Sequence, residues 1–244
     1  MDLSVFRVYN TPVSMIAFLN DLLNLFYPEV CASCGNALYS GERSICMMCR
    51  VILPRTGFES VPDNAVEKQF WGKVQLHSAA SLYHFHKGTK VQHLIHRLKY
   101  HGETEAGKEA GRLLGAALKE SGRFASAECV LPVPLHRKRL MSRGYNQSEP
   151  IASGIAEVLG IGCETDILER VKSGNSQTRK GRYERWENAG SSFKVVDPQK
   201  VRGRHFLIAD DVITTGSTLS ACAAILLACG ASSVSVASLA FATR

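Results

Sequence analysis

From about residue 74 onward, apolar segments of strand length alternate with segments of helical periodicity, and this alternation limits the possible folds most strongly. The expected strands lie at 74–85, 128–134, 164–169, 206–210 and 232–241, and the expected helices at 90–100, 104–120, 148–159 and 217–229. Strands that alternate with helices form βαβ units around a largely parallel sheet. The sequence therefore predicts an α/β domain over residues 74–244.

Four of the eight cysteines form two C-x-x-C pairs, Cys31 with Cys34 and Cys46 with Cys49. Four thiolates at this spacing suit a tetrahedral Zn²⁺ ion. The alternatives are two disulfides, which a reducing cytoplasm disfavours, or a redox C-x-x-C pair, which needs only one of the two. Because a site closed by four cysteines has no open coordination position, we expect a structural zinc ion.

Residues 1–55 are expected to form a small module of their own, and residues 54–73 to link it to the α/β domain. Apolar side chains recur at helical spacing in 15–26, which predicts an amphipathic helix docked on its own protein rather than on a membrane surface. Polar residues interrupt this stretch, and no other run approaches the roughly 18 apolar residues of a membrane span. We therefore expect no membrane span and a cytoplasmic location.

The composition is that of an ordinary globular protein, with 45% hydrophobic and 21% charged residues. The formal net charge of +7 favours anionic partners, which include phosphorylated metabolites, nucleic acid and acidic lipid headgroups. Charge alone does not choose among these partners.

Two adjacent carboxylates, Asp210 and Asp211, follow an apolar strand in the segment FLIADDVITTGST, residues 206–218. Ligands of parallel sheets bind outside the carboxyl ends of the strands, where paired carboxylates can accept hydrogen bonds from vicinal hydroxyls or hold a hydrated Mg²⁺ ion. The next residues could surround a phosphate with backbone N–H groups and hydroxyls at the start of a helix: Thr214, Thr215, Gly216, Ser217 and Thr218. A ribose 5-phosphate fits this order of groups, and a plain strand, turn and helix cap is the alternative.

Three ordered motifs resemble those of a known family. FLIADDVITTGST resembles the 5-phosphoribosyl 1-pyrophosphate (PRPP) motif of type I phosphoribosyltransferases. The segments VLPVPLHRKRLMSRGYNQS, 130–148, and RVKSGNSQTRKGRYERWENAGSSF, 170–193, are similar to motifs of the ComF family. An N-terminal helix, a module of four cysteines and a transferase domain are also that family's layout. The resemblance implies a type I phosphoribosyltransferase fold with a parallel sheet.

The resemblance implies that Asp210 and Asp211 bind the ribose hydroxyls of PRPP, and that residues 214–218 bind its 5-phosphate. The loop at 132–143 would meet the pyrophosphate, whose negative charge suits cationic side chains. The residues of that loop expected to do so are Pro134, Arg137, Lys138, Arg139 and Arg143. A nucleic-acid surface or a solvated basic patch is the alternative.

Arg170, Lys172 and Gln177 would lie on a mobile loop that closes over the site. The candidates for a catalytic role are Arg137, Arg143 and Lys172. Lys99 and Tyr100 match a Lys-Tyr pair of the family, and their role is left open.

Two classes of function follow. In the first, the protein transfers a phosphoribosyl group from PRPP with Mg²⁺ bound and releases pyrophosphate. In the second, the same fold is a non-catalytic module that binds PRPP or nucleotides, or serves DNA uptake, as the family's association with natural competence implies. Single-stranded DNA and the uptake machinery are the partners expected of the second class, and an oligomer is compatible with both.

Overall fold

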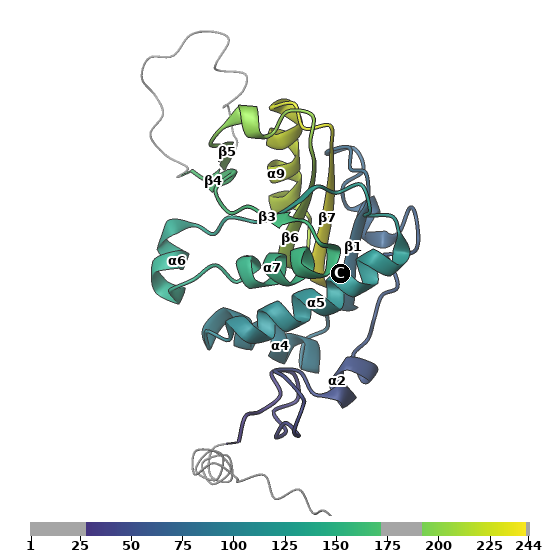
Figure 1. The fold of residues 1–244 in the computed structure, drawn as a ribbon, viewed down its shortest axis with the longest axis vertical. Coiled ribbons are helices and arrows are strands. Elements are labelled where there is room, and N and C mark those ends of the chain that lie inside the picture. Colours follow the sequence, from purple (N-terminus) through teal and green to yellow (C-terminus); the bar gives the residue numbers. More distant parts are fainter. Residues whose placement is uncertain (1–27, 172–191, 243–244) are drawn as a thin grey trace, which may run out of the picture.

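The computed structural model describes residues 28–171 and 192–242. The predicted helix at 15–26 lies outside the described residues, as do Lys172 and Gln177. A parallel sheet with the strand order β1-β7-β6-β2-β3 forms the centre of the molecule (Figure 1). Its strands are β1 (Ala79–His84), β7 (Ser233–Phe241), β6 (His205–Ile213), β2 (Cys129–Pro132) and β3 (Gly162–Cys163).

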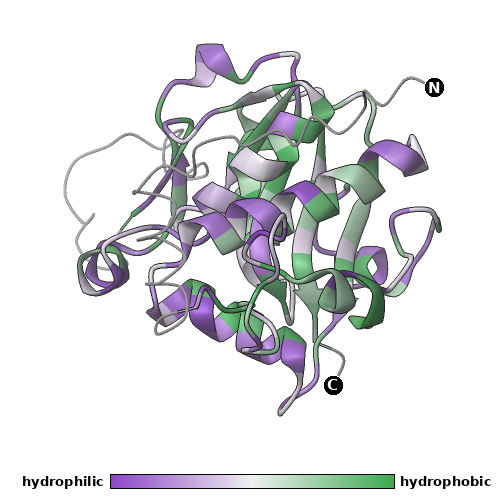
Figure 2. Ribbon diagram, turned by 60° about the horizontal axis from the view of Figure 1, so that its bottom comes forward, coloured by the Kyte–Doolittle hydropathy of each residue, from purple (hydrophilic) through white to green (hydrophobic). Residues whose placement is uncertain are grey.

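Helices cover both faces of the sheet, and this explains why its strands are almost continuously apolar. One face packs against α4 (Lys90–Tyr100), α5 (Thr104–Ser121) and α7 (Ser148–Leu159). The other face packs against α9 (Ser217–Ala228). In Figure 2 the strands are mostly green, whereas purple segments are frequent on the helices around them. The predicted α/β fold is confirmed.

Glycines bring α5 and α7 into close contact. Gly107, Gly111 and Gly115 recur at every fourth position of α5, and the last two lie against the backbone of Ile151 and Ile155 in α7. From the α7 side, a Cβ atom on Gly154 would lie 2.1 Å from the carbonyl oxygen of Lys108. Only a residue without a side chain fits at this crossing, so the glycines set how closely the two helices approach.

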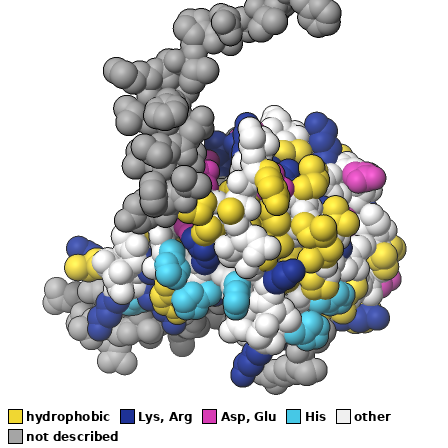
Figure 3. Space-filling model, turned by 90° about the horizontal axis from the view of Figure 1, so that it is seen from below, with side chains coloured by type: hydrophobic (Ala, Val, Ile, Leu, Met, Phe, Trp, Pro, Cys, Tyr) yellow, Lys and Arg dark blue, Asp and Glu magenta, His cyan; other side chains and the backbone are white. Residues whose placement is uncertain are grey.

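The four-cysteine module contacts the start of α4 and packs in one core with α5. Helix α2 (Met47–Ile52) of the module follows Cys46, and the buried residues of the described part of the module belong to the same core cluster as Leu94 of α4 and Leu114 of α5. An ion pair of 2.8 Å joins Arg50 of α2 to Glu109 of α5. The large apolar side chains of α2 that face away from this core are exposed, and Figure 3 shows hydrophobic side chains on the face seen from below.

The structure differs from the predicted elements in three places. A strand was expected at 164–169, but the chain there joins two short strands: β3 ends at Cys163, and β4 (Leu168–Arg170) pairs antiparallel with β5 (Phe193–Val195) in a separate sheet. In the expected linker, α3 (Ala65–Lys68) carries the buried Val66 into the core on the α9 side. The Asn64 side chain fixes this segment, because its Nδ2 donates to the Ala79 carbonyl oxygen at 2.8 Å.

The third difference is a helix in the basic loop. Residues Arg137–Arg143 form α6, which begins where His136 Nδ1 accepts the N–H of Lys138 and ends at Gly144 in a left-handed conformation. A short 3₁₀ helix, η1 (Pro198–Lys200), precedes β6. Among the helices of the described residues, none is both long enough and apolar enough to cross a bilayer.

Candidate ligand site at the carboxyl edge of the sheet

The acidic pair lies inside β6 rather than after it. On one side β6 pairs with β7 as far as Ile213, which keeps both aspartates in extended backbone. On the other side β2 ends at Pro132, which pairs with Ala209. Asp210 and Asp211 therefore stand just beyond the end of a neighbouring strand, where a parallel sheet leaves room for a ligand.

Asp210 is held by two donors on its Oδ1 atom. The hydroxyl of Ser148, the first residue of α7, donates at 3.0 Å, and the N–H of Asp211 donates at 2.9 Å. Removal from water and the neighbouring Asp211 carboxylate raise the pKa of Asp210 to about 7. Near neutral pH this carboxyl group therefore changes between a hydrogen-bond donor and a charged acceptor.

Asp211 is buried and has two different partners. Its Oδ1 accepts the N–H of Val212 at 2.7 Å, and its Oδ2 lies 2.8 Å from the ammonium of Lys99. Lys99 comes from the last turn of α4, about 110 residues earlier in the chain. The structure thus places at the acidic pair a residue whose role the sequence left open.

The turn at 214–218 leads from β6 into α9. Gly216 occupies the position before the helix with φ +71°, a conformation that favours glycine. The hydroxyls of Thr215 and Ser217 are 2.9 Å apart, and the N–H of Ser217 points to the Thr215 hydroxyl at 3.4 Å. Thr214 and Ser217 are exposed, so this turn presents hydroxyls and backbone N–H groups of a helix start to solvent.

Two residues that sequence reasoning did not single out support this turn. The ammonium of Lys73 donates to the carbonyl oxygen of Thr215 at 3.0 Å. A Cβ atom on Gly216 would lie 3.1 Å from the buried ring of Phe70. Both supports come from the expected linker, and no motif in that segment marked them.

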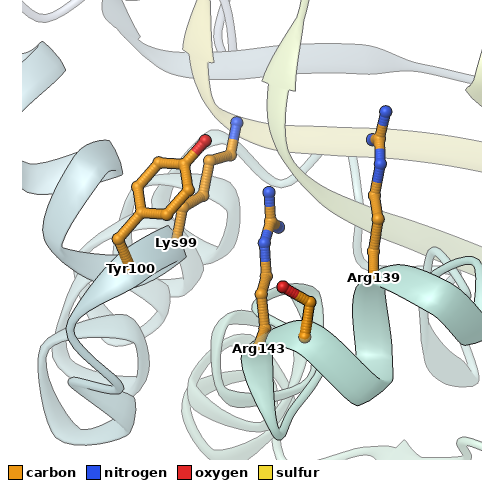
Figure 4. A pocket seen from close by; sticks show the side chains of 5 residues that line it. Lys99, Tyr100, Arg139 and Arg143 are labelled. Carbon is orange, nitrogen blue, oxygen red and sulfur yellow. The ribbon is translucent and has the colours of Figure 1, made fainter.

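A cationic pocket of about 490 Å³ lies between the end of α4 and α6. Its lining residues are Lys99, Tyr100, Arg139, Ser142 and Arg143. Figure 4 shows Lys99 and Tyr100 on one side and Arg139 and Arg143 on the other. None of these five lining residues is acidic, so the pocket suits an anion. Lys99 belongs to both the pocket and the acidic pair, and it therefore places them side by side.

The basic residues of α6 point in different directions. Arg139 and Arg143 line the pocket, whereas Arg137 and Lys138 are exposed and do not. Pro134, which is partly buried, lies two residues past the end of β2. The pocket accordingly contains two of the four cations predicted for a pyrophosphate.

Arg143 is held by its neighbours. Its Nη1 donates to Gln147 Oε1 at 2.7 Å, and its guanidinium lies 5.5 Å from the ring centre of Tyr100. The hydroxyl of Tyr145 donates to the carbonyl oxygen of Leu98 and so ties this segment to the end of α4. These contacts hold the two walls of the pocket against each other.

Arg170, expected on a mobile loop, ends β4, and its guanidinium lies 5.2 Å from the ring centre of Phe193 in β5. Its expected loop partners, Lys172 and Gln177, fall outside the described residues. Their assignment to the site remains a prediction.

The four predicted cysteine ligands come together in the module. Their sulfur atoms all lie within 4.8 Å of one another, and those of Cys34 and Cys46 are 3.8 Å apart. Ligands at the Zn–S distance of about 2.3 Å in a tetrahedron are separated by roughly 3.8 Å. Within 28–171 and 192–242, this is the one group of histidine, cysteine or acidic side chains close enough to hold a metal ion.

Backbone N–H groups point at these sulfur atoms. Those of Cys46 and Ser33 lie 3.3 Å and 3.4 Å from Cys31 Sγ, and the N–H of Cys49 lies 3.4 Å from Cys46 Sγ. Burial opposes ionisation of Cys31, but N–H groups of Cys46, Cys34 and Ser33 outweigh it and lower the pKa of its thiol to about 7. Burial instead raises the pKa of the Cys46 and Cys49 thiols. A metal binds the thiolate form, and it is the close spacing of the four sulfur atoms that fits a structural ion.

Comparison with known proteins finds one matching family model and several similar proteins. Residues 146–244 match the family model of the phosphoribosyl transferase domain. The chain is 32% identical over 146 residues to DNA utilization protein YhgH of Salmonella typhimurium, which covers 59% of this chain and 63% of that protein. It is 31% identical over 147 residues to Competence protein F of Haemophilus influenzae, which covers 59% of this chain and 64% of that protein. The match thus spans just under two thirds of the length of these relatives.

Solved structures that match the chain include a glutamine PRPP amidotransferase from B. subtilis complexed with ADP and GMP, at 22% identity and a TM-score of 0.41 over 58% of this chain and 30% of that one. An adenine phosphoribosyltransferase matches at 16% identity and a TM-score of 0.34 over 61% of this chain and 83% of that one. The domain match and the parallel sheet observed in this chain agree with the predicted type I phosphoribosyltransferase fold. The chain is therefore similar to Competence protein F and DNA utilization protein YhgH over 59% of its length, and its residues 146–244 match the phosphoribosyl transferase domain, which agrees with its resemblance to the ComF family.

Proposed function

We propose that the protein binds PRPP at the carboxyl edge of β6 and transfers its phosphoribosyl group with release of pyrophosphate. The observation that carries this proposal is the position of Lys99, which lines the cationic pocket and lies 2.8 Å from Asp211. A carboxylate pair suited to ribose hydroxyls is therefore next to a pocket suited to a polyanion. In PRPP the pyrophosphate is attached to C1 of the ribose ring, and the two hydroxyls are on the next two carbon atoms, C2 and C3.

In this assignment Asp210 and Asp211 accept hydrogen bonds from the ribose hydroxyls, and the turn at 214–218 binds the 5-phosphate. Lys99, Arg139 and Arg143 surround the pyrophosphate and stabilise the negative charge that grows on it as it leaves. Fixed positions of the two ends of the ligand hold the ribose C1 atom between them, which lowers the entropy cost of the reaction. Asp210 and Asp211 would also hold Mg²⁺, which neutralises part of the charge of PRPP when bound.

For the module we propose zinc as the metal, bound by Cys31, Cys34, Cys46 and Cys49. The sulfur spacing and the N–H groups directed at two of the sulfur atoms support this assignment. The ion would be structural, since four thiolates complete its coordination.

The names of the relatives support a role in competence or DNA utilization. One observation favours direct contact with nucleic acid as a second function, because Arg137 and Lys138 are exposed and lie outside the pocket. Their charges would remain available to a phosphate backbone while PRPP occupies the site.

Calorimetric titration with PRPP, with and without Mg²⁺, tests the main proposal. The wild-type protein should bind PRPP in the presence of Mg²⁺, and the double variant Asp210→Asn with Asp211→Asn should lose roughly 1.5 to 3 kcal/mol for each charge-assisted hydrogen bond removed. Asp166→Asn, which alters an exposed aspartate paired with Lys200, is the matched control and should bind normally.

Pyrophosphate release from PRPP, measured across candidate acceptor compounds, separates a transferase from a binding module. Release that depends on an acceptor supports transfer. PRPP binding without release under any acceptor would leave only the binding function, and absence of PRPP binding with Mg²⁺ present would overturn the site assignment.

A further inference from the structure

Lys99 lies outside residues 146–244, which match the domain family, and yet it touches both halves of the proposed site. Its ammonium pairs with Asp211, whose side chain is 7% exposed, while the Lys99 side chain itself is 25% exposed. The ammonium is therefore partly open to the pocket that its own side chain lines. A ligand at the acidic pair and a ligand in the cationic pocket would therefore both contact Lys99.

The two partners of Asp211 occupy different oxygen atoms. Oδ1 already accepts the N–H of Val212 at 2.7 Å, a contact fixed by the backbone of β6. Oδ2 faces Lys99 at 2.8 Å. A ribose hydroxyl that donates to Oδ2 must share this oxygen with the lysine or replace the lysine, so at Oδ2 the ion pair of the free protein competes with ribose.

An anion in the pocket would reduce this competition. The guanidinium groups of Arg139 and Arg143 line the same space and attract an anion next to the ammonium of Lys99. The four-carbon side chain of lysine allows its ammonium to move without movement of the backbone. The hydroxyl of Tyr145 meanwhile holds the end of α4 through the carbonyl oxygen of Leu98.

We propose that Lys99 couples the two halves of the site: its ammonium pairs with Asp211 in the free protein and turns to an anion when one enters the pocket, which leaves Asp211 Oδ2 to the ribose hydroxyls. This inference rests on the proposed function. Each half of the ligand favours the arrangement that the other half needs, so the two bind with positive cooperativity. Lys99 is then a positioning residue for the ribose as well as a contact of the pyrophosphate.

The test compares the binding of ribose 5-phosphate with and without saturating methylenediphosphonate, a stable pyrophosphate analogue, in Mg²⁺-free buffer so that no cation bridges the two ligands. In the wild-type protein the analogue should tighten ribose 5-phosphate binding by about five-fold or more, the lower end of typical coupling between sites. In Lys99→Gln the factor should fall to one, because a neutral amide is not drawn to the anion. Lys99→Arg, which keeps the charge, should retain much of the factor.

Lys90→Met is the matched control, since Lys90 is an exposed lysine at the other end of α4, and it should keep the wild-type factor. If Lys99→Gln does not fold, Lys99→Met replaces it as the uncharged variant. Melting curves show whether each variant is folded. A wild-type protein that binds both ligands independently, or a Lys99→Gln protein that keeps the coupling, would overturn the role of Lys99. A wild-type protein that also fails to bind PRPP with Mg²⁺ would instead overturn the proposed function.

Discussion

Asp210 and Asp211 are adjacent in sequence but differ in chemistry. Asp211 has a lysine ammonium as its neighbour, whereas Asp210 has a serine hydroxyl and a backbone N–H. Asp210 is partly removed from water and lies next to a second carboxylate, so it binds a proton more tightly, and this is why the pKa of Asp210 rises. The pair can therefore carry one negative charge or two, depending on pH and ligand.

This difference predicts a dependence of stability on pH. The pKa of Asp210 is raised from its usual value near 3.8 to about 7, so the folded protein binds this proton more tightly than the unfolded chain does. The contribution of Asp210 to the free energy of unfolding should therefore fall as pH rises from about 4 to about 7. Asp210→Asn should remove this part of the pH dependence and raise stability above pH 7. Urea unfolding between pH 5 and pH 8.5 measures the free energy of unfolding of both proteins. If this free energy changed with pH by the same amount in the wild type and in Asp210→Asn, the raised pKa would be contradicted.

Among the elements, the contact between α5 and α7 positions the site most directly. Ser148, which donates to Asp210, is the first residue of α7, and the glycines of α5 set where α7 lies. Packing on one face of the sheet thus determines the position of a hydroxyl at the acidic pair.

We expect Gly154→Ala to destabilise the protein. The new methyl group would lie 2.1 Å from the carbonyl oxygen of Lys108 and 2.8 Å from the backbone nitrogen of Arg112, so the helices must move apart. Overpacking of this kind costs about 1–3 kcal/mol. Gly162→Ala is the control, because its added Cβ atom meets nothing within 4 Å. Thermal unfolding should separate the two variants, and equal melting temperatures would show that α7 can shift freely.

The exposed cations of α6 allow DNA binding to be tested separately from PRPP binding. If Arg137 and Lys138 contact a phosphate backbone, Arg137→Gln with Lys138→Gln should weaken single-stranded DNA binding and reduce its salt dependence by about two charges. PRPP affinity should stay unchanged, because neither side chain lines the pocket. Fluorescence anisotropy at several salt concentrations measures the affinity for single-stranded DNA and its salt dependence. Loss of PRPP binding in this double variant would place these residues in the ligand site instead.

Most of the elements could be predicted from the sequence, because buried strands and amphipathic helices have strong periodic patterns. The helix in the basic loop was missed since it is seven residues long and has no buried residue. The role of Lys99 was missed for a different reason. Its contact with Asp211 joins residues more than a hundred positions apart, and no local pattern encodes such a pairing. Lys73 and Phe70 lie in a segment expected to be a linker, where neither was expected to support the turn.

At the scale of the whole molecule, the cysteine module and the helices share one core. Buried Cys31, Ile45 and Leu53 belong to the same cluster as the buried faces of α4 and α5. The ion pair between Arg50 and Glu109 also crosses this boundary. Loss of structure in the module would therefore expose apolar surface of the α/β domain as well.

Metal analysis should accordingly find about one zinc ion per chain, since the four sulfur atoms form a single site. Removal of the metal by a chelator, or Cys31→Ser, should lower the melting temperature of the entire protein in one transition. Elemental analysis and far-UV circular dichroism measure these effects. Protein that contains no metal and shows four reactive thiols would rule the site out, and two separate transitions would show that the module unfolds alone.

Helix α4 connects the two sites. At its start the carbonyl oxygen of Lys90 accepts a hydrogen bond of 3.1 Å from the hydroxyl of Ser33, which lies between the proposed metal ligands Cys31 and Cys34. Near the end of α4, Lys99 pairs with Asp211. The eleven residues of the helix form a rigid strut of about 16 Å. If zinc fixes the start of this strut, metal and PRPP must each raise the affinity for the other by the same factor. Protein without its metal should then bind PRPP more weakly, so an ion with no part in the chemistry would still act on the ligand site through the position of one helix.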